Sequence, residues 1–132
     1  MPSILYVVRS VVAILTMSSG GLLHAQSALS MCQSYSKQMN RSLPGKIDFL
    51  TVLESTGCTS DNGIVYFQFY HVISDPASLP RDVSTKSKAA AKRSYCKNEE
   101  FRNSLLFFSF DFYYYDKSNR PLYSFSIGKS DC

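Results

Sequence analysis

The stretch FSFDFYYYDKSNRPLYSFSI, residues 108–127, decides the fold. Its side chains alternate in type on both sides of a polar break at 116–121, which predicts two strands joined by a hairpin turn. One face of this hairpin is a row of apolar side chains: Phe108, Phe110, Phe112, Tyr114, Tyr123, Phe125 and Ile127. A row of this kind predicts the core face of a sheet.

The other face of the hairpin carries the candidate partner-binding residues. Residues 64–74, IVYFQFYHVIS, form the clearest further strand, and we expect its polar row to share a face with the polar row of 109–115. The candidates are Tyr66, Gln68, Tyr70, Asp111, Tyr113 and Tyr115. Tyrosine is frequent at interfaces because it joins apolar area to a polar tip. The alternative is a partly solvated face on which tyrosine is simply a good strand former.

The rest of the chain supplies helices and one more apolar strand. Residues 27–43 have apolar positions at spacings of three and four, which predicts an amphipathic helix. Residues 46–56 predict a strand, residues from Pro80 to about Cys96 a helix, and Asn98 the N-cap of a short helix. The expected fold is α+β in the order α-β-β-α-α-β-β. It has an antiparallel sheet of four to five strands with helices packed on one face.

Residues 1–25 have the layout of a secretory signal peptide, with one arginine, an apolar run and small residues. We expect cleavage between 25 and 28, a single α+β domain over 26–132, and a periplasmic or secreted location. The mature part holds four cysteines, Cys32, Cys58, Cys96 and Cys132. An even number in an exported chain predicts two disulfides, with three connectivities open. Their spacing does not suit a metal site.

Charge and composition argue against several functions. Removal of Arg9 with the leader leaves 13 basic and 10 acidic residues, a net charge of +3, too weak a bias to predict nucleic-acid binding. No cofactor or nucleophile motif occurs, and His71 stands on a strand face that is otherwise aromatic or aliphatic, so we expect no enzyme. An enzyme resting on His71 is the least favoured hypothesis. The basic helix around 86–97 is either a solvated face or a surface for an acidic partner, and any membrane contact is at most peripheral.

The segment YCKNEEFRNSLLFFSFDFYYYDKSNRPLYSFSIGKSDC, residues 95–132, resembles the closing segment of the AspS-like secretin pilotins of type II secretion. In that family a cysteine precedes a short helix, a strand hairpin and a terminal cysteine. MNRSLPGKIDFLTVLEST, residues 39–56, is similar to the end of the family's first helix and its first strand. The resemblance implies a periplasmic fold with one bridge between Cys96 and Cys132 and the other between Cys32 and Cys58.

The resemblance also implies a partner, the C-terminal helix of a secretin subunit, bound in an apolar groove. Such pilotins are usually lipoproteins, whereas Met31 is a poor residue before a lipidated Cys32, which predicts a non-lipidated variant. The leading hypothesis is therefore an exported, non-enzymatic, pilotin-like accessory that binds protein. The alternative is a secreted inhibitor or immunity protein that blocks a hydrolase or toxin.

Overall fold

The computed structural model describes residues 25–132, so the expected signal peptide at 1–25 lies outside the described residues except for Ala25. The helices and strands follow the expected order, with one additional strand. They are α2 (Ala25–Asn40), β1 (Gly45–Asp48), β2 (Thr51–Thr59), β3 (Val65–Val72), α3 (Val83–Lys97), α4 (Glu99–Ser104), β4 (Ser109–Tyr115) and β5 (Pro121–Ile127). Short 3-10 turns lie at Pro76–Ser78 and Lys129–Asp131.

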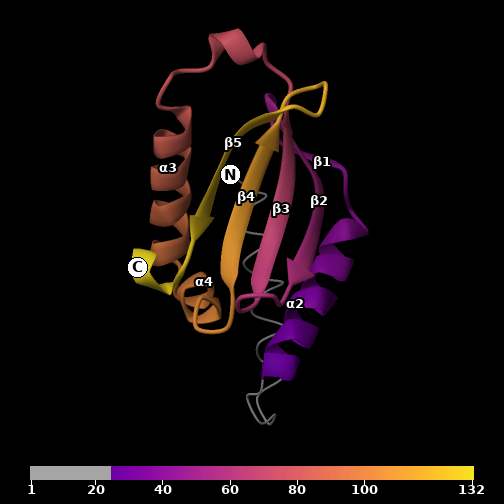
Figure 1. Ribbon diagram of the computed structural model, residues 1–132, viewed down its shortest axis with the longest axis vertical. Coiled ribbons are helices and arrows are strands. Elements are labelled where there is room, and N and C mark those ends of the chain that lie inside the picture. The colour runs from indigo at the N-terminus through magenta and orange to yellow at the C-terminus, as the bar shows by residue number, and fades with distance from the viewer. Residues whose placement is uncertain (1–24) are drawn as a thin grey trace.

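The five strands form one sheet in the order β1-β2-β3-β4-β5. Three of the four neighbouring pairs are antiparallel, as expected, but β3 and β4 are parallel. The prediction of a purely antiparallel sheet is therefore wrong at this pair. The reason is visible in Figure 1: α3 carries the chain back along the sheet, so that β4 starts at the same end as β3. A helical crossover is the usual connection between parallel strands.

The helices lie on one face of the sheet, as the sequence predicts. Tyr35 of α2 contacts Tyr66 of β3, with ring centroids 5.1 Å apart, and Tyr95 of α3 contacts Phe110 of β4 at 4.9 Å. Tyr66 and Phe110 are themselves neighbours on that face, at 5.7 Å. Figure 1 shows α2 beside β2 and α3 beside β5, so the two helices flank the middle strands.

The core lies between the sheet and these helices. Phe110 has no exposed surface, and the expected core residues Phe108, Phe112 and Ile127 are also buried. The short helix α4 adds Phe101, whose ring stacks on Tyr95 at 4.3 Å. Its start is the expected Asn98 cap. The Oδ1 atom of that side chain accepts hydrogen bonds from the backbone N–H groups of residues 100 and 101.

The predicted strand at 46–56 is divided into β1 and β2 by a tight turn, which corrects the sequence interpretation. Oδ1 of Asp48 accepts a hydrogen bond from the backbone N–H of Leu50 at 2.8 Å, and this side-chain bond mimics a backbone turn. Phe49 at the tip is 82% exposed. An apolar sequence concealed the turn, because the usual glycine or proline signal is missing.

β1 pairs with only part of β2, and a side chain of α2 makes hydrogen bonds to the backbone groups of β2 that β1 leaves without a partner. Asn40 donates from Nδ2 to the carbonyl of Thr56 at 3.0 Å, and its Oδ1 accepts from the backbone N–H of Thr56 at 2.9 Å. Ser36 adds a hydrogen bond to the Thr56 hydroxyl at 2.8 Å. The amide of Asn40 thus replaces the peptide group of a neighbouring strand and fixes the end of α2 on the sheet.

We expect Asn40→Ala to lower the free energy of unfolding by about 2 kcal/mol, because both backbone groups of Thr56 lose their partner in a partly buried place. Urea unfolding followed by circular dichroism measures the change. Ser42→Ala, two residues away on an exposed position, serves as the control and should cost less than about 0.5 kcal/mol. Equal losses in the two variants would contradict this role of Asn40.

Two disulfides close the fold, and their pairing confirms what the family resemblance implies. Cys32 of α2 is bonded to Cys58 of β2, and Cys96 near the end of α3 is bonded to the terminal Cys132. The first bridge joins the helix to the strand beneath it, and the second anchors the chain end. Because the sulfur of Cys32 is bonded to Cys58, this cysteine is not a site for a thioether-linked lipid.

Candidate functional site

The six candidate binding residues do not share one face, which corrects the sequence interpretation. The parallel register sets Tyr66 opposite Phe110, Gln68 opposite Phe112 and Tyr70 opposite Tyr114. The row from β3 therefore belongs to the helix-covered face, and all three of its members are buried. The row from β4, Asp111, Tyr113 and Tyr115, lies on the opposite, outer face of the sheet and is half-buried.

The outer face carries a compact aromatic cluster. Phe69 contacts Tyr113 and Tyr115 with ring centroids 5.4 and 5.9 Å apart. Phe67 lies over Gly57 of β2, where an added Cβ would come within 2.2 Å of the ring. Glycine at 57 thus makes room for a flat-lying phenylalanine. Asp111 accepts hydrogen bonds from the hydroxyls of Tyr113 and Ser126, so each of its two carboxylate oxygens is bonded to a side chain of the sheet.

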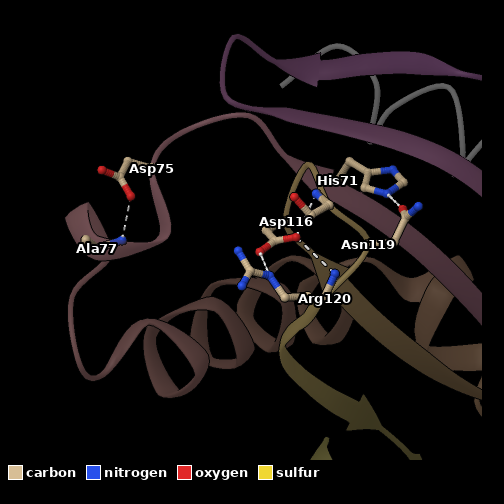
Figure 2. A network of polar contacts seen from close by, with 7 residues as sticks. His71, Asp75, Ala77, Asp116, Asn119 and Arg120 are labelled. Carbon is tan, nitrogen blue, oxygen red and sulfur yellow. Dashed lines mark hydrogen bonds and ion pairs between the residues drawn. The ribbon is translucent and has the colours of Figure 1, made fainter.

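His71 also lies on the outer face, and its contacts indicate that it connects neighbouring segments. Nδ1 is 3.1 Å from Oε1 of Glu54, and Nε2 is 2.5 Å from Oδ1 of Asn119 in the β4–β5 turn. Figure 2 shows this contact beside Asp116, which accepts hydrogen bonds from the backbone and guanidinium of Arg120. His71 thus ties β2, β3 and the hairpin together. Within residues 25–132, the hydrogen-bond and ion-pair partners of its ring nitrogens are Glu54 and Asn119.

A groove of about 550 Å³ opens on the helix-covered face. α2 forms one wall and α3 the other, β1 closes one side, and the middle strands form the floor. The wall from α3 is made of four small side chains, Ser87, Ala90, Ala91 and Ser94, together with Tyr95. The apolar lining comes chiefly from Met39, Leu43, Ile47, Leu53, Phe101 and Phe112. Among the described lining residues, Lys46 and Asp48 are the charged ones, and both belong to β1.

Three stacked tyrosines cross the groove floor. The ring of Tyr114 lies between those of Tyr70 and Tyr123, with centroids 4.7 and 4.4 Å away and nearly parallel planes. The Tyr123 hydroxyl lies 3.2 Å from the hydroxyl of Ser87 in the α3 wall. Such a floor offers broad apolar surface with a few hydroxyl groups, a common composition for binding sites.

Gln68 is the buried polar group of the floor. The Tyr70 hydroxyl donates to its Oε1 at 2.5 Å, and its Nε2 donates to the Tyr95 hydroxyl at 3.5 Å. Burial raises the pKa of Tyr95 to about 12 and raises the pKa values of Tyr70 and Tyr114 well above that of free tyrosine. These phenols therefore stay neutral at physiological pH, and the floor carries no charge.

The raised tyrosine pKa values predict alkaline destabilisation. The phenols ionise near pH 10 in the unfolded chain but only at higher pH in the folded chain. Their contribution to stability is thus complete below about pH 10 and is lost as the pH rises further, by up to about 1.4 kcal/mol per pH unit for each such tyrosine. Urea unfolding between about pH 8 and pH 11 measures the loss. Tyr114→Phe should make it shallower; an unchanged slope would contradict the account.

The family resemblance implies an apolar groove, but of the residues that line it only Gln68 and Tyr70 are among the predicted candidates. Its α3 wall lies in the basic segment, where the lysines suggest a solvated helix. The signal that could have found it is the spacing of the small residues at 87, 90, 91 and 94, which forms one helical face. In residues 25–132, no cluster of three or more histidine, cysteine or acidic side chains could hold a metal ion.

Comparison with known proteins gives likenesses in structure alone. The sequence matches no protein-family model, and none of the curated proteins matches it. A protein of Pseudomonas aeruginosa described as secreted has a similar solved structure, with a TM-score of 0.71 and 16% identity. That match covers 86% of this chain and 99% of the other.

Two pilotins of type II secretion have similar structures. EpsS of Vibrio vulnificus matches with a TM-score of 0.67 and 9% identity over 81% of this chain and 93% of its own. AspS of Vibrio cholerae matches with a TM-score of 0.62 and 11% identity over 81% and 94%. The chain thus has a pilotin-like fold. No helix within residues 25–132 is long and apolar enough to span a membrane.

Proposed function

We propose that this chain is an exported, non-enzymatic accessory of a bacterial type II secretion system that binds a protein helix in its groove. The observation that carries the proposal is a groove between α2 and α3 with an uncharged, aromatic floor, in a fold similar to that of EpsS and AspS. A single helix laid in an apolar groove is a recurring mode of recognition, with anchors at spacings of three and four residues. The proposed partner is the C-terminal helix of a secretin subunit.

Two further features support this proposal. The pair of disulfides suits an oxidising compartment such as the bacterial periplasm. Phe49, at the turn between β1 and β2, follows the lining residue Asp48 and leaves a large apolar side chain exposed beside the groove. An exposed phenylalanine next to an apolar groove is readily explained as additional contact area for the same partner.

The test is a pair of matched variants on α3. Ala90 lines the groove and its partly buried neighbour Ala89 does not, so tryptophan adds the same side chain to the same helix inside and outside the lining. We expect Ala90→Trp to weaken binding of the secretin C-terminal peptide at least tenfold, since the added ring occupies the groove, and Ala89→Trp to change it less than about twofold. Isothermal titration calorimetry measures both. A similar affinity in the two variants, or no binding by the unaltered protein, would contradict the proposal.

The second candidate is an inhibitor or immunity protein that docks through the outer face. The half-buried rings of Phe69, Tyr113 and Tyr115 favour it, because aromatic clusters are common at protein interfaces. Tyr113→Ala should then weaken binding of the partner by more than about 1 kcal/mol. If the groove is the docking site, the same variant leaves the affinity unchanged.

A further inference from the structure

The two helices that wall the groove carry charge of one sign only. α2 contains one basic residue, Lys37, and α3 contains five, while neither contains an aspartate or glutamate. The groove between them is itself almost uncharged. Charge complementarity determines which partners dock and how fast. The positive helices therefore restrict the charge of the partner more than the floor does.

The bases of α3 are not spread evenly around the helix. Lys86, Ala90, Arg93 and Lys97 follow one another at spacings of four, three and four residues, which places them on one stripe. Ala90 of that stripe lines the groove, and the three bases are exposed. The basic stripe therefore borders the groove along its α3 wall.

Bases border the groove on two other sides. Arg41 is exposed just after α2 and lies in the sequence between Met39 and Ser42, which both line the groove. Lys46 of β1 lines the groove directly. Two carboxylates, Asp48 and Asp82, stand against the five bases Arg41, Lys46, Lys86, Arg93 and Lys97. Asp48 accepts the backbone N–H of Leu50, and Asp82 lies 3.4 Å from Lys86 in an exposed pair. The mouth of the groove thus keeps an excess of positive charge.

We infer that the occupant of the groove is an acidic amphipathic helix, which places an apolar stripe on the tyrosine floor and aspartate or glutamate side chains on its flanks. This inference rests on the proposed function and adds the charge of the partner. The flank that lies along α3 faces Arg93 and Lys97, and the opposite flank faces Arg41. A helix with basic flanks would meet like charge on both walls.

The partner's charge is tested by selection from a displayed library of helical peptides with a randomised apolar stripe and randomised flanks. We expect the selected peptides to carry aspartate or glutamate on the flanks and the affinity to fall as salt is raised. Selected peptides with neutral or basic flanks would overturn the inference and leave the groove as a helix-binding site. No selected peptide at all would contradict the proposed function itself, and the inference with it.

A second measurement uses two neighbouring bases of α3. Arg93 belongs to the basic stripe, whereas Lys92, equally exposed, lies roughly 100° away around the helix. Charge reversal at each position changes the net charge equally. We expect Arg93→Glu to weaken binding of a selected peptide about fivefold and Lys92→Glu to weaken it less than about twofold. Equal losses would indicate non-specific attraction to the whole protein and would overturn the inference.

The same variants separate a peptide from a lipid surface. Vesicles of phosphatidylglycerol present negative charge without an apolar helix. If the wild-type protein binds these vesicles and Arg93→Glu abolishes that binding while leaving peptide affinity unchanged, the stripe serves a membrane and the inference is overturned. We expect peptide affinity to respond to Arg93→Glu and vesicle binding to stay weak in both proteins.

Discussion

Replacing Phe110 by alanine is expected to lower the free energy of unfolding by about 4 kcal/mol, the range observed for large aromatic side chains removed from a core. Phe110 has no exposed surface and touches the rings of Tyr66, Tyr95 and Phe101, which come from β3, α3 and α4. Its removal leaves a cavity that these neighbours cannot easily fill, because each is held by its own element. Urea unfolding followed by circular dichroism gives the value.

Phe69→Ala is the matched control, since Phe69 lies on the outer face of the neighbouring strand and is half-exposed. We expect it to cost about 1–2 kcal/mol, because part of its area already faces solvent and a truncated ring leaves no closed cavity. A loss as large as that of Phe110→Ala would contradict the assignment of the core to the helix-covered face.

Replacing Cys96 and Cys132 together by serine is expected to cost about 4 kcal/mol. The bridge closes a segment with a sequence separation of 36, and the loss of unfolded-chain entropy in a loop of this length has that size. Small domains are stable by only about 5–15 kcal/mol, so the double-serine variant should unfold at a much lower urea concentration than the unaltered protein.

Cys32→Ser with Cys58→Ser provides the comparison. Its sequence separation of 26 is smaller, and the loop-entropy model predicts a loss within about 0.5 kcal/mol of the first pair. Non-reducing peptide mapping should recover both bridges from the unaltered protein. Free thiols at Cys96 or Cys132, or an undiminished stability without their bridge, would contradict the structure.

Much of the fold follows from local patterns in the sequence. The hairpin of β4 and β5 has strict alternation on both sides of a polar turn, and the core row of Phe108, Phe110 and Phe112 lies where that alternation predicts. The Asn98 cap is equally local, since one side chain bonds to N–H groups two and three residues ahead. Interactions of this range depend on few other residues.

The pairing of β3 with β4 could not be obtained in the same way. Alternation shows that Tyr66, Gln68 and Tyr70 share a face, but it does not show which face the helices cover. The helices can cover this row because the Tyr70 hydroxyl donates to the Gln68 amide, and that amide donates to the Tyr95 hydroxyl. Phe67 and Phe69 occupy the outer face instead, where Gly57 and the β4 tyrosines pack against them.

The groove depends on contacts between segments far apart in the sequence. Its walls come from α2 and α3, and its tyrosine floor combines β3, β4 and β5. Two of the six candidate residues, Gln68 and Tyr70, line it. For Asp111, Tyr113 and Tyr115 on the outer face, binding stays a prediction.

The measurement that tests the central claim most directly is a nuclear magnetic resonance titration of the 15N-labelled chain with the secretin C-terminal peptide. We predict that the backbone signals of α2, β1 and α3 around Met39, Ile47 and Ala91 shift on binding, and that signals near Phe69, Tyr113 and Tyr115 stay in place. Shifts confined to the outer face would contradict the groove as the docking site.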